Sequence, residues 1–159
     1  MIAKLLPTLI FTAAIGSGVV GGIFFAFSSF VMPGLARMPA AGGIAAMNSI
    51  NVTAVTPLFM TALFGTALVC LVVGAGAVMG LSQSGSLWLI AGSLVYLIGI
   101  VVVTMVFNVP LNDALAAVDP ASSEGANLWS RYLNEWVTWN HVRTISGIAA
   151  LASFWFAAR

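Results

Sequence analysis

The segment Leu87–Phe107 reads LWLIAGSLVYLIGIVVVTMVF and contains no charged side chain. A helix needs about 20 apolar residues, at a rise of about 1.5 Å per residue, to cross the hydrocarbon core of a bilayer. This segment is long enough by itself, and so are Pro7–Val31 and Pro57–Met79. The sequence therefore predicts an all-α protein that is integral to the membrane.

The composition of the whole chain supports this class. Hydrophobic residues make up 61% of the sequence and charged residues only 6%, and the mean hydropathy of +1.10 is far above that of a soluble domain. A length of 159 residues fits one domain, so we expect residues 1–159 to form a single transmembrane domain. The net charge of +1 leaves no basic patch for nucleic acid.

A fourth span is predicted at Trp139–Ala158. Its uninterrupted apolar part, Ile145–Ala158, would be about 21 Å long as a helix, whereas a full crossing needs about 30 Å. The missing length must come from Trp139–Thr144. This arithmetic places His141 and Arg143 at or just inside the membrane boundary.

Four spans, at about residues 7–31, 57–79, 87–107 and 139–158, predict a four-helix bundle. The short polar turn Leu81–Ser86 joins the second and third spans, and the two longer loops, Met32–Thr56 and Asn108–Thr138, lie together on the other side. The first loop includes a mildly amphipathic stretch around Ile44–Val55. An even number of spans puts both termini on one side. The Lys and Arg counts of the two sides are nearly tied, but Lys4 beside the first helix favours cytoplasmic termini.

Small residues recur every four positions on the first span, at Ala14, Gly18, Gly22 and Ala26. Such a stripe lets two helix backbones approach closely in lipid. We interpret it as the packing face of the first helix. The same stripe is compatible with a homo-oligomer.

The region before the last span predicts one continuous helix from about Leu128 to the C-terminus, because its large side chains share one face. That face carries Trp129, Tyr132, Leu133, Trp136, Trp139 or Asn140, and Arg143. Two interpretations stay open. The aromatics either line a pocket on which Asn140, His141 and Arg143 converge, or form a belt at the lipid headgroups, with Arg143 reaching lipid phosphate.

A second polar cluster, Asn108–Asp113, closes the third span. Pro110 disfavours helical geometry at Val109, so the cluster is either a capped helix end or a break that turns Asn108 and Asn112 towards Arg143. A buried guanidinium needs a partner, and Asp113 or Glu135 is then the expected ion-pair partner. Another pair of amides, Asn48 and Asn51, is interpreted as surface or capping groups.

Several chemistries lack their usual residues. One histidine and the single Cys70 do not suffice for an ordinary zinc or haem site within one subunit, and no P-loop is present. No carboxylate falls inside an apolar span, which argues against a proton or cation relay and a permease. We therefore expect neither a metal nor a cofactor.

Three segments together carry a resemblance to a known family. They are Phe25–Leu35 (FAFSSFVMPGL), Asn108–Asn112 (NVPLN) and Trp136–Thr144 (WVTWNHVRT). On these residues the chain resembles the anthrone oxygenase-like family of small four-helix membrane proteins. The resemblance implies oxidation of a polyketide anthrone by O₂ to an anthraquinone, without metal or flavin.

That chemistry needs a base for a carbon-bound proton, donors or a cation for the resulting enolate, and a water-poor pocket. Our hypothesis makes His141 the base and Arg143 the cation, both catalytic. The expected substrate-binding residues are Asn108, Asn112 and Asn140 for the oxyanion, and Tyr132, Trp136 and Trp139 for the rings. The alternative is a non-catalytic membrane module that binds a lipid or small hydrophobic molecule, or that assembles with partner helices.

Overall fold

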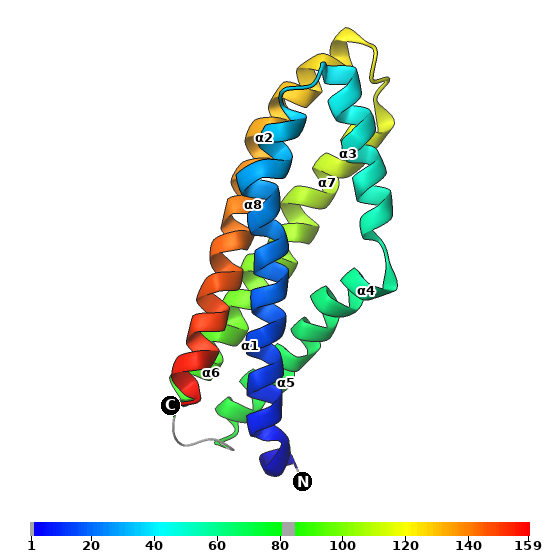
Figure 1. The fold of residues 1–159 in the computed structure, drawn as a ribbon. Helices are drawn as coiled ribbons and strands as arrows, with labels where there is room; N and C mark the ends of the chain where they lie inside the picture. Colours follow the sequence, from blue (N-terminus) through cyan, green and yellow to red (C-terminus); the bar gives the residue numbers. More distant parts are fainter. Residues whose placement is uncertain (1, 81–84) are drawn as a thin grey trace.

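The computed structural model describes residues 2–80 and 85–159, with side chains from Leu5 onwards. Long helices run along a common axis, and the two termini lie at the same end (Figure 1). No strand occurs in the described part of the chain, so the predicted all-α class is confirmed.

The first two helical rods run in opposite directions. The first consists of α1 (Ile2–Ala26), the π-helical turn η1 (Phe27–Val31) and α2 (Met32–Leu35). After a short turn, α3 (Ala40–Ala54) leads back towards the end of the molecule that carries the termini (Figure 1).

The third rod continues in the direction of α3. It is made of α4 (Pro57–Met60), the π-helical turn η2 (Thr61–Gly65) and α5 (Thr66–Val78). Pro57 disfavours a helical residue before it, and the Thr56 hydroxyl accepts a hydrogen bond from the Phe59 amide at 3.3 Å, which caps the new helix. The chain therefore bends between α3 and α4.

The last two rods run antiparallel to each other. The fourth contains α6 (Ser86–Tyr96), the π-helical turns η3 (Leu97–Val102) and η4 (Thr104–Asn108), and α7 (Val109–Ala117). The fifth is α8 (Ser123–Ala157), a single helix of 35 residues that the Ser122 hydroxyl caps by accepting from the Gly125 amide at 2.9 Å. The continuous helix predicted from about Leu128 is confirmed, and it begins five residues earlier.

Two expectations about loops were wrong. The segment Met32–Thr56 is largely helical, because Ile44 and Met47 bury one face of α3 against the aromatic side chains of α8. The described residues therefore form five helical rods, and not the four helices that the sequence predicted. Pro110 does not break the chain: it follows directly on the π-helical turn η4, at the junction with α7, and both Asn108 and Val109 before it stay helical.

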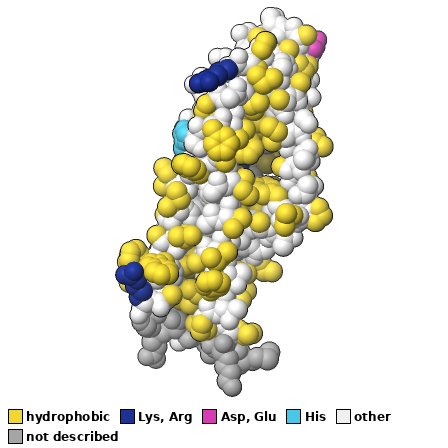
Figure 2. Space-filling view, viewed as in Figure 1, with side chains coloured by type: hydrophobic (Ala, Val, Ile, Leu, Met, Phe, Trp, Pro, Cys, Tyr) yellow, Lys and Arg dark blue, Asp and Glu magenta, His cyan; other side chains and the backbone are white. Residues whose placement is uncertain are grey.

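Within residues 2–80 and 85–159, three helical segments are long and apolar enough to cross a membrane: Leu5–Leu35, Pro57–Val78 and Ser86–Ala117. The predicted spans at 7–31, 57–79 and 87–107 fall on these segments. The fourth predicted span lies in α8, where Asn140, His141 and Arg143 interrupt the apolar run, so α8 does not belong to this class. Hydrophobic side chains cover much of the visible surface along the length of the molecule, and basic side chains lie towards its two ends (Figure 2).

Helix α8 packs against α1 and α6, and α1 also packs against α5. The closest approach of α1 and α8 is at Gly21 and Gly147. A Cβ atom added to Gly147 would lie 2.6 Å from the Cα atom of Gly21. The predicted stripe was shifted by one residue, because Gly22 is exposed and has nothing within 4 Å of an added Cβ. A four-residue spacing does not say which of several small residues faces the neighbouring helix.

We expect Gly147→Ala to lower the free energy of unfolding by about 1–3 kcal/mol, because an added methyl group must push two backbones apart. The measurement is the thermal unfolding midpoint of the purified protein in detergent. Gly22→Ala is the matched control on α1 and should unfold at or slightly above the wild-type temperature, since alanine is the better helix former. A Gly147→Ala midpoint equal to that of Gly22→Ala would contradict the close approach.

Candidate functional site

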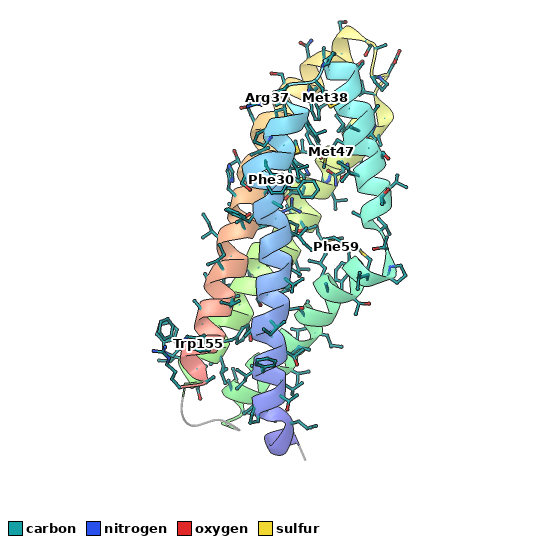
Figure 3. All side chains as sticks on the ribbon, in the orientation of Figure 1. Phe30, Arg37, Met38, Met47, Phe59 and Trp155 are labelled. Atoms are coloured by element: carbon teal, nitrogen blue, oxygen red, sulfur yellow. The ribbon has the colours of Figure 1, made fainter. Side chains whose placement is uncertain are left out.

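A cavity of about 570 Å³ lies between α1, α3, α4–η2, η4–α7 and α8. The surface is hollowed beside α3 (Figure 2), and Met47 on α3 and Phe59 on α4 both point into the enclosed space (Figure 3). The lining is mainly apolar. Its large side chains are Ile23, Phe24, Phe27, Met47, Ile50, Phe59, Met60, Leu63, Phe64, Met105, Val109 and Trp136.

Arg143 supplies the positive charge of this cavity. Its side chain is only 4% exposed, and its guanidinium carbon lies 4.2 Å from the centre of the Phe24 ring and 4.8 Å from that of Trp136. One terminal nitrogen donates to Asn140 Oδ1 at 2.8 Å and the other to Thr104 Oγ1 at 3.4 Å. The Nε–H group is buried and has no hydrogen-bond partner in the described part of the chain. The guanidinium thus keeps a free donor while it is held by aromatic rings.

The expected ion pair of Arg143 with Asp113 or Glu135 is wrong. Glu135 binds Arg131 through two hydrogen bonds of 2.8 and 3.0 Å on the exposed face of α8, and hydrogen bonding to Arg131 lowers the pKa of Glu135. Asp113 is exposed and forms no ion pair with any described residue. Arg131 lies four residues before Glu135, the spacing at which helical side chains meet, and so it competes successfully for the carboxylate.

Asn112 organises the aromatic side chains beside Arg143. Its Oδ1 atom accepts from the Tyr132 hydroxyl at 2.7 Å and from Trp136 Nε1 at 2.8 Å. Tyr132 is stacked between Trp129 and Trp136, with ring centres 5.7 and 5.6 Å away. Burial raises the pKa of Tyr132 well above its ordinary value, which keeps its hydroxyl a donor. These three aromatic residues are buried inside the protein, which excludes the headgroup belt for them.

The other predicted binding residues lie behind or outside the cavity wall. Asn108 is buried and donates from Nδ2 to the Trp136 carbonyl at 3.1 Å. Trp139 stacks on Phe107 with ring centres 3.6 Å apart and is partly exposed. Neither residue lines the cavity. Of the eight predicted site residues, those that line it are Asn112, Trp136 and Arg143.

His141 differs most from its predicted position. It is exposed, its Nδ1 atom lies 2.9 Å from the Ser28 hydroxyl, and it does not line the cavity. It lies two positions before Arg143 in the sequence, and this spacing corresponds to a rotation of about 200° around a helix. Nearness in sequence was therefore misleading. The expected convergence of His141 and Arg143 on one pocket does not occur.

The wall formed by α3 was missed because its sequence was interpreted as a loop. Asn51, interpreted as a surface or capping group, lines the cavity, and its Nδ2 group is buried without a hydrogen-bond partner among the described residues. Asn48 donates from Nδ2 to the Leu115 carbonyl at 3.2 Å. The signal was present, since Ile44, Met47 and Asn51 follow the three- and four-residue spacing of one helical face.

Comparison with known proteins identifies a family. A family model described as anthrone oxygenase matches residues 54–153, which include α4–η2, η4–α7 and most of α8. No curated protein and no solved structure matches the chain.

We expect Arg143→Met to raise the free energy of unfolding by about 1–3 kcal/mol. A buried charge without a counter-charge opposes folding, and functional sites commonly retain groups that reduce stability. The thermal midpoint in detergent measures this, with Arg131→Met on the exposed face as the control. A lower midpoint for Arg143→Met than for the control would mean that the guanidinium chiefly stabilises the fold.

Proposed function

Because the chain belongs to the anthrone oxygenase family, we propose that it oxidises a flat hydrophobic aromatic substrate, anthrone- or quinol-like, with O₂ and without a cofactor. The substrate would occupy the cavity beside Arg143. The volume of the cavity, about 570 Å³, supports this placement because it is within the range of small-molecule binding sites.

The observation that carries the proposal is the charge of Arg143 in an apolar cavity. Among the described residues that line the cavity it is the only ionisable one. A positive group in such surroundings favours a ligand that carries, or develops, negative charge on an oxygen atom. A group that meets charge developing during the reaction stabilises the transition state more than the bound substrate, which is the condition for catalysis.

In an anthrone, the carbon that reacts is the methylene carbon that joins the two outer aromatic rings opposite the carbonyl. The carbon between the two rings loses a proton, and the resulting enolate places its oxygen against the Arg143 guanidinium. The enolate gives one electron to O₂, the two radicals combine to a peroxide anion at that carbon, and this anion takes up a proton to become a hydroperoxide. Its O–O bond then breaks, the second hydrogen of the carbon leaves as a proton, and a carbonyl and one water form. One O₂ is consumed for each quinone, and no external reductant is required.

The first proton needs an acceptor other than His141, which lies outside the cavity. We propose that water at the cavity opening accepts it, and that Arg143 makes ionisation of the bound substrate more favourable. The side-chain amide of Asn51, which lines the cavity and faces the Tyr132 hydroxyl, provides a donor for a second oxygen of the substrate.

The apolar rim of the opening suggests how the substrate arrives. Val55, Phe64 and Met105 line the cavity and are 70%, 46% and 55% exposed. We propose that the C-terminal part of α8 makes the fourth membrane crossing, that the termini are cytoplasmic, and that the substrate enters from the bilayer. A homo-oligomer remains a prediction from the sequence.

The second candidate function is non-catalytic binding of a lipid or another small hydrophobic molecule with an acidic headgroup. It is favoured by the lack of a carboxylate or histidine among the described cavity-lining residues. Turnover separates the two functions, since only the first consumes O₂.

We expect the purified protein to oxidise emodin anthrone faster than its autoxidation in air, and Arg143→Gln to lower kcat/KM by about 10²–10³-fold, the range for a lost oxyanion donor. O₂ uptake and quinone absorbance measure the rate, and one labelled oxygen from ¹⁸O₂ should enter the quinone. Arg131→Gln should retain wild-type activity. Rates equal to autoxidation for the wild-type protein would leave the binding function.

A further inference from the structure

A chain of hydrogen bonds connects the exposed His141 to the buried Arg143. Its central member is Asn140, which is fully buried. The Nδ2 group of Asn140 donates to the Phe24 carbonyl at 2.8 Å and to the Ser28 hydroxyl at 2.7 Å, and its Oδ1 atom accepts from Arg143 at 2.8 Å. The amide is therefore oriented with its carbonyl oxygen towards the guanidinium.

The outer member of the chain is Ser28 in the π-helical turn η1. Its oxygen accepts from Asn140, and its own hydrogen still needs an acceptor. His141 Nδ1 is the nearest one, at 2.9 Å, whereas Thr144 Oγ1 is 3.4 Å away. The Thr144 hydroxyl itself donates to the backbone carbonyl of Asn140 at 2.9 Å. This arrangement assigns the acceptor role to Nδ1 of His141.

We propose that His141, Ser28 and Asn140 are positioning residues that hold the Arg143 guanidinium against the cavity, and that His141 acts through this chain and not as a base on the substrate. The inference rests on the proposed function in one respect, since it takes Arg143 as the group that meets the ligand. It replaces the catalytic role expected for His141 from the sequence.

The physical basis is the two-sided character of the Asn140 amide. Turned by half a rotation, the amide would aim its NH₂ group at the guanidinium, and two donors would face each other in a buried place, which is unfavourable. The Ser28 oxygen favours the observed orientation by accepting from Nδ2. The acceptor on His141 in turn keeps the Ser28 hydrogen directed outwards, away from Asn140.

The test compares His141→Asn with His141→Ala. The Asn Oδ1 atom is bonded to Cγ, as Nδ1 is in histidine, and it accepts a hydrogen bond but is not a base at neutral pH. His141 is exposed, so neither substitution removes core packing. Ser28→Ala removes the middle of the chain. Ser29→Ala is the matched control, because Ser29 is exposed in the same turn and bonds only to the Phe25 carbonyl.

Three quantities are measured for each purified variant: the Kd of 1,8-dihydroxyanthraquinone, from quenching of tryptophan fluorescence, and the kcat and KM for 1,8-dihydroxyanthrone. We expect His141→Ala and Ser28→Ala to weaken probe binding about five- to tenfold, which corresponds to one hydrogen bond of about 1 kcal/mol. His141→Asn should stay within about twofold of wild type, and Ser29→Ala should be unchanged.

Equal loss of kcat in His141→Asn and His141→Ala, with probe binding unchanged, would overturn the proposal and restore His141 as a base. Unchanged probe binding in both His141→Ala and Ser28→Ala would also overturn it. If no protein, including wild type, oxidises the anthrone but the binding pattern holds, the proposed oxidation fails and the positioning chain stands.

Discussion

The guanidinium of Arg143 is the constraint on which the rest of the site depends. A cation inside an apolar bundle must be stabilised by whatever surrounds it, and here no carboxylate is within reach in the described part of the chain. The stabilisation comes from the faces of two aromatic rings and from amide and hydroxyl oxygens. Each of these partners has its own support, as Trp136 is held by Asn112 and Asn140 by Ser28. These polar groups thus form one connected system around the Arg143 guanidinium.

Helix geometry makes room for this system. Three π-helical turns surround the cavity: η1 carries Ser28, η2 carries Leu63, and η4 carries Thr104 and leads into α7. A π-helical turn holds an extra residue, which shifts the side chains that follow around the helix axis. Such turns are frequent at functional sites. In this chain they bring a hydroxyl to each side of the Asn140–Arg143 pair.

The parts of the structure that depend on length and local spacing could be predicted from the sequence. Apolar runs long enough for a bilayer are helices, and the spacing of Trp129, Tyr132 and Trp136 correctly indicated one buried face of α8. Asn112 and Arg143 both line the cavity. The errors arose where another residue competed for an ion-pair partner, and where the position of a residue along or around its helix was misjudged. Arg131 competes for Glu135, Pro110 lies at the junction of a π-helical turn and an α-helix, and the direction of His141 follows from a rotation that proximity in sequence conceals.

The bend between α3 and α4 lies close to where the match to the family model begins, so the wall of the cavity is only partly inside the matched region. Residues 54–153, which the family model matches, contain Arg143, Asn112 and Trp136, whereas Met47, Ile50 and Asn51 on α3 precede that region. The side chains of α3 help to shape the cavity, whereas the guanidinium contacts come from Phe24, Trp136, Thr104 and Asn140 on other helices. A substitution on α3 therefore alters which molecular outline fits, and leaves the charge that meets it in place. The shape of the cavity and its charge thus come from different helices.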